Sequence, residues 1–113
     1  MDKFGALSDP TRRSIVEMLA RKGALSATDI SKQFRMSPPA VSQHLKVLRE
    51  AKLVQMEKRA QQRIYRINPD AVHELEDWAR QLVELFNQRF DALDALLEVE
   101  KKKASQINHR KDE

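Results

Sequence analysis

The sequence predicts a mainly α-helical chain with one small β-hairpin, and three observations lead to this fold class. Two helical segments meet at a short turn near Met36, which is the helix-turn-helix arrangement. Two stretches of strand-like composition, 53–58 and 63–67, follow directly and predict the β-hairpin. Apolar residues then recur every three or four positions over 72–99, which predicts one long helix.

Size and composition limit what this fold can do. The chain has 113 residues, of which 41% are hydrophobic, so it can form one domain with a modest core. It has no cysteine and only 2 glycines, which excludes thiolate sites, disulfides and glycine-rich phosphate loops. No apolar run approaches the ~18 residues of a membrane span, and no signal peptide opens the chain. We therefore expect a cytoplasmic protein that does not contact a membrane.

Charge is distributed unevenly along the chain, although the net charge is only +4. Residues 1–68 contain 14 Lys and Arg against 6 Asp and Glu, whereas residues 69–100 contain 2 against 9. The last stretch, 101–113, contains 5 against 2. A basic front half favours nucleic-acid binding, while an ordinary solvated surface is the alternative. The charge alone does not distinguish nucleic-acid binding from a solvated surface, so the distinction depends on the pattern of residues along the helices.

The first helices are predicted from their start and stop signals. A short helix is expected within 2–7. Asp9 is a capping residue for the next helix, Pro10 suits its first position, and Gly23 follows its last turn. Ser26 then opens a third helix in a sequence that resembles a capping box.

The predicted helix over 38–50 has a core face and a free face. Ser37 is the expected cap, and because Pro39 has no N–H, its hydroxyl has to bond the next amide, that of Ala40. The core face consists of Val41, Leu45 and Leu48. The free face consists of Pro39, Ser42, Gln43 and Lys46, which are side chains suited to base edges and phosphates.

The hairpin has a basic tip near Arg59, and a basic hairpin after a helix-turn-helix is a wing suited to the DNA backbone or minor groove. The fold class is therefore a winged helix-turn-helix with a long C-terminal dimerisation helix. His44 either contacts a phosphate, better when protonated, or packs beside the hairpin. The predicted DNA-binding residues are Ser37, Pro39, Ser42, Gln43, His44, Lys46, Lys58, Arg59, Gln61, Gln62 and Arg63.

The long helix predicts a homodimer. A helix over 69–103 would be about 50 Å long, more than the first 68 residues can cover, so a second copy is expected on its apolar stripe. The alternative is that the short first helix covers it alone. The predicted interface consists of Phe4, Leu7, Leu75, Trp78, Leu82, Leu85, Phe86, Leu93 and Leu96.

These predictions combine into one domain over 1–113. The winged helix-turn-helix core occupies 8–68, and the dimerisation helices occupy 1–7 and 69–103. The polar end of the chain, 104–113, is expected to be a disordered tail.

Three stretches resemble the ArsR/SmtB family of bacterial winged-helix repressors. They are 6–12 (ALSDPTR), 36–54 (MSPPAVSQHLKVLREAKLV) and the hairpin strand 63–67 (RIYRI), and the resemblance covers about residues 4–100. It implies a homodimer whose two recognition helices read adjacent major grooves of a pseudo-palindromic operator in double-stranded DNA. It also implies repression in the free form and release by an inducing signal, which the sequence does not identify.

The chain departs from the family at two positions where the family usually has glycine. Lys52 stands between the recognition helix and the wing, and Ala60 stands in the wing tip. A positive φ would cost a lysine on the order of 1 kcal/mol, so we expect a differently shaped turn at Lys52. At Ala60 we expect a shorter or stiffer wing.

Many relatives hold a metal through cysteines or through Asp, His and Glu pairs on the last helix. Cysteine is absent, and His73 and Asp77 lack a second histidine pair about ten residues further on. We therefore expect no metal site and no cofactor. A metal-sensing repressor that uses His73 and Asp77 remains the alternative.

Two other functions are alternatives to DNA binding. No nucleophile with a base, no carboxylate pair and no cofactor loop can be assembled from the sequence, so we do not expect an enzyme. An interaction module that has lost DNA binding is the second alternative, and the polar and basic face over 39–46 argues against it. Operator sequence, regulated genes and the choice between repression and activation are not readable from the sequence.

Overall fold

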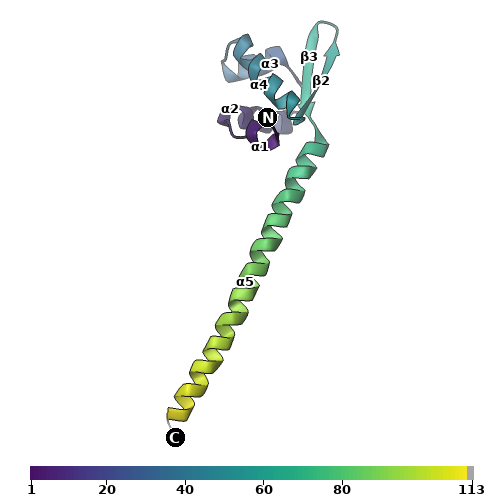
Figure 1. Ribbon diagram of the computed structural model, residues 1–113. Helices are drawn as coiled ribbons and strands as arrows, with labels where there is room; N and C mark the ends of the chain where they lie inside the picture. The colour runs from purple at the N-terminus through teal and green to yellow at the C-terminus, as the bar shows by residue number, and fades with distance from the viewer. Residues whose placement is uncertain (112–113) are drawn as a thin grey trace. The chain divides into compact units, whose positions relative to one another are not determined.

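The computed structural model describes the backbone of residues 1–111 and the side chains of residues 1–105. The chain divides into two compact units, where the sequence predicts one domain. The first unit is Met1–Glu74 and contains the whole predicted winged helix-turn-helix core, 8–68. The second unit begins at Leu75, within the last helix. Figure 1 labels the helices and strands.

The first two helices start at the predicted capping residues. Helix α1 spans Lys3–Ala6, and helix α2 spans Pro10–Lys22. The Asp9 carboxylate accepts hydrogen bonds from the first-turn amides of α2, 2.8 Å from Thr11 N. Gly23 ends α2 with φ of 82°, a value that favours glycine. The start and stop signals in the sequence are therefore confirmed.

The helix-turn-helix consists of α3 (Ala27–Phe34) and α4 (Pro38–Glu50). Ser26 caps α3, and the Ser37 hydroxyl accepts from Ala40 N at 3.3 Å, which is the bond that Pro39 requires. Arg35 makes the turn in the left-handed conformation, with φ of 53°. Both helices and the short turn between them match the prediction.

The sheet has one strand more than the sequence predicted. The predicted hairpin is present as β2 (Val54–Arg59) and β3 (Gln62–Ile67), and β1 (Leu25–Ser26) adds an antiparallel strand in the order β1-β3-β2. Leu25 pairs with Tyr65, and Arg59 pairs with Gln62 across the hairpin end. A strand of two residues has no alternating pattern, so it gives no signal in the sequence.

The backbone corrects one expectation about the missing glycines. Lys52 and Ala60 adopt left-handed conformations themselves, with φ of 63° and 52°. The turn at Lys52 therefore keeps the backbone that glycine favours, and the expectation of a different shape there is wrong. The Asn68 side chain holds this turn, because its Nδ2 donates to Lys52 O at 2.9 Å.

The core of the first unit lies where α4 contacts the other helices and β2. The predicted core face of α4 is confirmed, since Val41, Leu45 and Leu48 are all buried. They are joined there by the largest fully buried side chains of the other elements, Ile15, Ile30 and Leu53. Burial of this face leaves the opposite side of α4 free.

Helix α5 spans Pro69–Lys111 and has 43 residues. It passes the predicted end near Lys103 and includes residues 104–111, where the sequence predicts a disordered tail, and residues 112–113 lie outside the described part. Every residue described from Glu76 to Ser105 is exposed. In the described residues, no helix is long and apolar enough to span a membrane.

Candidate nucleic-acid interface

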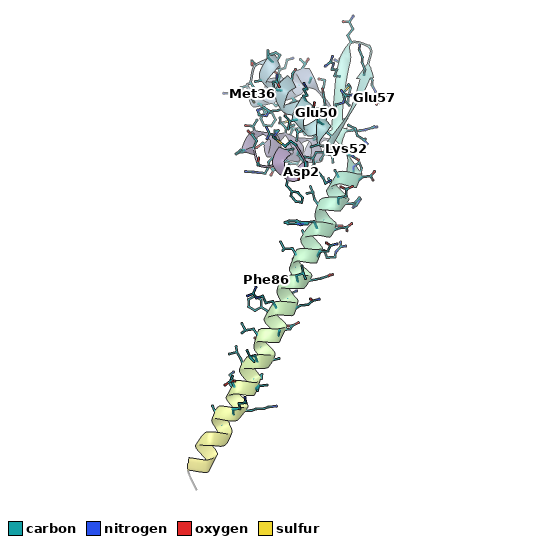
Figure 2. All side chains as sticks on the ribbon, in the orientation of Figure 1. Asp2, Met36, Glu50, Lys52, Glu57 and Phe86 are labelled. Atoms are coloured by element: carbon teal, nitrogen blue, oxygen red, sulfur yellow. The ribbon has the colours of Figure 1, made fainter. Side chains whose placement is uncertain are left out.

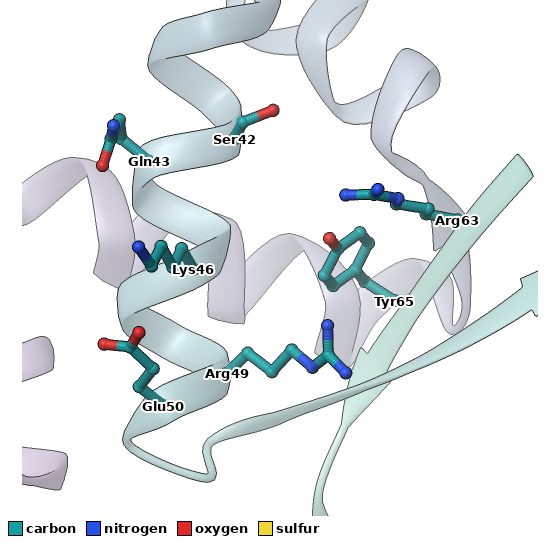
Figure 3. A pocket seen from close by; sticks show the side chains of 7 residues that line it. All are labelled: Ser42, Gln43, Lys46, Arg49, Glu50, Arg63 and Tyr65. Carbon is teal, nitrogen blue, oxygen red and sulfur yellow. The ribbon is translucent and has the colours of Figure 1, made fainter.

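The free side of α4 and strand β3 enclose a hollow of about 570 Å³ (Figure 3). Four of the predicted DNA-binding residues line it, namely Ser42, Gln43, Lys46 and Arg63. Three more residues line it that the sequence reasoning did not select, namely Arg49, Glu50 and Tyr65. The hollow is thus a junction between the predicted recognition helix and the predicted wing.

Helical spacing explains which side chains of α4 reach the hollow. Because the core-facing residues of α4 are buried, the remaining positions fan across its free face. Ser42 and Arg49 are seven residues apart and therefore lie on nearly the same line of the helix. In Figure 3, Arg49 extends toward β3, whereas Gln43 and Glu50 extend away from that strand. The free face therefore has a wing side and an outer side.

Strand β3 contributes a buried ring and an exposed cation to the hollow. Tyr65 is paired with Leu25 on one side and Met56 on the other, and only 6% of its surface is exposed. Its side chain nevertheless lines the hollow, next to Arg63 in Figure 3. Arg63 is exposed and pairs with Lys58 across the hairpin, so two cations lie side by side on the wing.

The cations of the hollow are electrostatically unsatisfied. In the described part of the chain, Lys46, Arg49 and Arg63 form no ion pair. Glu50 is the single acidic residue among the seven that line the hollow. The balance of charge in the hollow is therefore positive, which suits an anionic ligand such as a phosphate.

The other predicted wing residues lie at the hairpin end and do not line the hollow. Lys58, Arg59, Gln61 and Gln62 are all exposed, and Arg59 forms an ion pair with Glu57 at 3.6 Å. The structure therefore separates the predicted wing contacts into Arg63 at the hollow and a polar tip beyond it.

The remaining predicted contacts at α4 lie outside the hollow. Ser37 and Pro39 are exposed at the start of the helix, where the serine hydroxyl already serves as the cap. His44 is half-buried and acts electrostatically on Asp9 at the start of α2. The pKa of Asp9 lies below its ordinary value, chiefly because the Arg12 backbone N–H donates to the carboxylate. Burial is the next largest influence and raises the pKa, while the Thr11 N–H and, more weakly, the electrostatic effects of Arg12 and His44 lower it further.

Most of the predicted dimer-interface residues lie on α5, where they form an exposed apolar stripe. Trp78, Leu82, Leu85, Phe86, Leu93 and Leu96 all expose about half or more of their surface. Phe86, labelled in Figure 2, makes an edge-on ring contact with Phe90 at 4.6 Å between centroids. Leu75 is half-buried, as is Leu7 in the first unit, and Phe4 is 46% exposed.

Acidic residues of the alternative metal site on α5 interact with basic side chains. Asp77 accepts a hydrogen bond from Arg80 at 3.3 Å, and His73 is exposed. Glu74 forms an ion pair with Lys3, and this contact lowers the pKa of Glu74. Among the described residues, no group of three or more His, Asp or Glu side chains could hold a metal ion.

Comparisons with known proteins agree with this architecture. Residues 9–56 match the family described as "Bacterial regulatory protein, arsR family". The chain is 35% identical over 75 residues to the transcriptional repressor SdpR of Bacillus subtilis, which covers 66% of this chain and 82% of that protein. It is 47% identical over 64 residues to the HTH-type transcriptional regulator Rv2034 of Mycobacterium tuberculosis, which covers 57% of this chain and 59% of that protein.

The fold is also similar to solved structures. An ArsR-like transcriptional regulator from Rhodococcus sp. RHA1 superimposes with a TM-score of 0.72 at 26% identity. The superposition covers 82% of this chain and 87% of the other. The mainly helical architecture with a small antiparallel sheet is therefore shared with a regulator of known structure.

Proposed function

Because the chain belongs to the ArsR family of bacterial regulatory proteins, and is thus a DNA-binding transcriptional regulator, we propose that it is a homodimeric repressor. It binds a pseudo-palindromic operator through α4 and the β2–β3 hairpin, in the cytoplasm and without a catalytic role. One observation carries this proposal. The hollow between α4 and β3 contains three cations that have no acidic partner among the described residues.

In this proposal α4 lies in the major groove and the wing follows the backbone beside it. Ser42 and Gln43 read base edges, since an amide side chain can bond two atoms of one adenine. Lys46, Arg63, Lys58 and Arg59 neutralise phosphates, which contributes affinity without sequence preference.

Dimerisation supplies the second reading helix. The apolar stripe of α5 is too exposed to be stable as a free surface of an isolated chain, so a second copy covers it. A two-fold dimer then presents two copies of α4 to half-sites about 34 Å apart, which is one turn of DNA. An operator with two-fold sequence symmetry follows from the symmetry of the protein.

A gel-shift titration tests the repressor proposal on the DNA upstream of the protein's own gene and on random DNA of equal length. We expect tight binding to the upstream DNA that weakens steeply as salt rises. Gln43→Ala is expected to lower the preference for upstream over random DNA about 10-fold, because one base contact contributes 1–3 kcal/mol to discrimination. Lys46→Ala is expected to weaken binding to both DNAs by the same factor.

Arg21→Ala is the matched control, because Arg21 is an exposed cation on α2 that does not line the hollow. It removes one positive charge and is expected to change binding little. Absence of any binding to upstream DNA at low salt contradicts the proposed function. Equal effects of Gln43→Ala on both DNAs contradict the assignment of base reading to Gln43.

A further inference from the structure

We propose that Arg49, Arg63 and the Tyr65 hydroxyl form a seat for one phosphodiester group of the DNA backbone, on the wing side of the hollow. This inference rests on the proposed DNA-binding function and assigns a task to Arg49 and Tyr65, which the sequence did not select. The seat fixes how deeply and in which register α4 lies, while Ser42 and Gln43 read bases.

The first argument is the position of Arg49. It is on the same line of α4 as Ser42 and extends toward β3 rather than outward (Figure 3). Its guanidinium is exposed and has no ion pair in the described part of the chain. A guanidinium presents a planar fork of donors that matches two phosphate oxygens.

The second argument is the fixed hydroxyl of Tyr65. Tyr65 is paired with Leu25 and Met56 on the two neighbouring strands and the residue is 6% exposed, so burial limits the positions that its hydroxyl can take. Among the described residues the hydroxyl has no hydrogen-bond partner, yet the side chain lines the hollow. A tyrosine with a buried ring and a polar tip at the surface is suited to donate one hydrogen bond to a ligand.

The third argument is the charge around these three groups. Arg49 and Arg63 approach the hollow from two different elements, with Tyr65 between them (Figure 3). Glu50 extends to the outer side of α4, so its carboxylate does not face this end of the hollow. Two cations and one hydroxyl donor around a single space suit a group with one negative charge and two free oxygens. Such contacts position the protein and carry no sequence information.

Tyr65→Phe is the sharpest test, because it removes the hydroxyl and keeps the packed ring. We expect binding to upstream and random DNA to weaken by the same factor of about 10, with the melting temperature almost unchanged. Arg49→Ala is expected to weaken both equally and to change the slope of log K against log salt by well under 1, because Arg63 still neutralises the same phosphate. Arg21→Ala again serves as the control for loss of a charge.

If Arg49 and Arg63 bind the same phosphate, the double variant has a predictable salt dependence. Arg49→Ala with Arg63→Ala should reduce the salt slope by about 1, although each single variant changes it by well under 1, because both cations neutralise the same group. Scanning the upstream DNA with single methylphosphonate substitutions should find one position per half-site at which Arg49→Ala has no further effect. At that position the charge that the seat binds has already been removed.

The outcomes separate the seat from the function on which it rests. Failure of the wild-type protein to bind DNA contradicts the proposed function. Normal DNA binding by wild type, Tyr65→Phe and Arg49→Ala alike overturns the seat alone. A loss confined to upstream DNA also overturns it, since these residues would then read bases. A salt-slope change of about 2 in the double variant overturns the sharing of one phosphate.

Discussion

Leucine has opposite environments in the two units of this protein. Leu48 in α4 is fully buried, whereas Leu85 in α5 is 63% exposed. Both fall on apolar faces with helical periodicity, so the local pattern does not distinguish them. The first unit buries its apolar face with its own helices and sheet, while α5 presents an apolar face that nothing in the described part of its own unit covers.

Charge follows the same division. The basic excess lies before residue 69, and the acidic excess lies over 69–100. A positive first unit suits phosphate, and a negative α5 does not. We infer that the first unit contacts DNA and that α5 contacts a second copy of the chain. Substitutions can therefore remove the residues of one contact and leave those of the other in place.

The largest expected effect comes from the core of the first unit. Leu48→Ala should lower the free energy of unfolding by about 2–5 kcal/mol, because it leaves a cavity among packed side chains. The size of this loss should not depend on protein concentration. Leu85→Ala is the matched control, and its effect, measured by urea unfolding, should grow with concentration because it acts through the dimer. If both variants lost the same free energy of unfolding at every protein concentration, Leu85 would not act through a dimer, and the contrast between the two units would be contradicted.

The second effect concerns the stripe on α5. Leu82→Glu combined with Phe86→Glu should weaken dimerisation more than about 100-fold, because carboxylates on a buried stripe lose their hydration. Sedimentation velocity measures the change, and circular dichroism should still show a folded first unit. Glu84→Gln, at an exposed position between them that is not apolar, is the control and should leave the dimer intact. A monomeric wild-type protein at micromolar concentration would refute the proposed dimer.

The helices and the hairpin could be predicted because their signals are local. Asp9, Ser26 and Ser37 each bond an amide within three residues, so the sequence around each cap is sufficient to place the helix start. The pairing of β1 with β3 joins residues about forty positions apart, and no local pattern reports it. The helix also continues past Lys103, where apolar periodicity stops but the residues remain good helix formers.

The candidate site was predicted only in part for a similar reason. Lys46 and Gln43 are recognisable from the wheel of one helix. Arg49 is on the same wheel, seven residues after Ser42, and that spacing is a signal that could have found it. In the sequence, nothing distinguishes Tyr65 from other strand residues, because its position in the hollow depends on the packing of the hairpin beside α4. Its contribution depends on tertiary structure rather than on sequence neighbours.

A smaller effect tests the strain that the first unit carries in its turns. Lys52 has φ of 63°, so Lys52→Gly should raise the free energy of unfolding by up to about 1 kcal/mol, because relief of the left-handed strain outweighs the added entropy of the unfolded chain. Gly23→Ala is the opposite change, at a position with φ of 82° and no atom within 4 Å of an added Cβ. It should destabilise by about 1–3 kcal/mol through the backbone alone. Thermal unfolding of the two variants measures both, and opposite signs are expected.

The smallest effect is the acid sensitivity of the Asp9 cap, which is confined to the first unit. The folded pKa of Asp9 is lowered, mainly by the Arg12 backbone N–H, so the folded state favours the carboxylate. Its contribution to stability is therefore complete above the unfolded pKa, near pH 4, and is lost as pH falls through the lower folded value. Asp9→Asn keeps an oxygen that can cap the helix but removes the titration. The stability of this variant should change less than that of wild type as pH falls below about 4, and a parallel decline of both would assign the acid sensitivity to other groups.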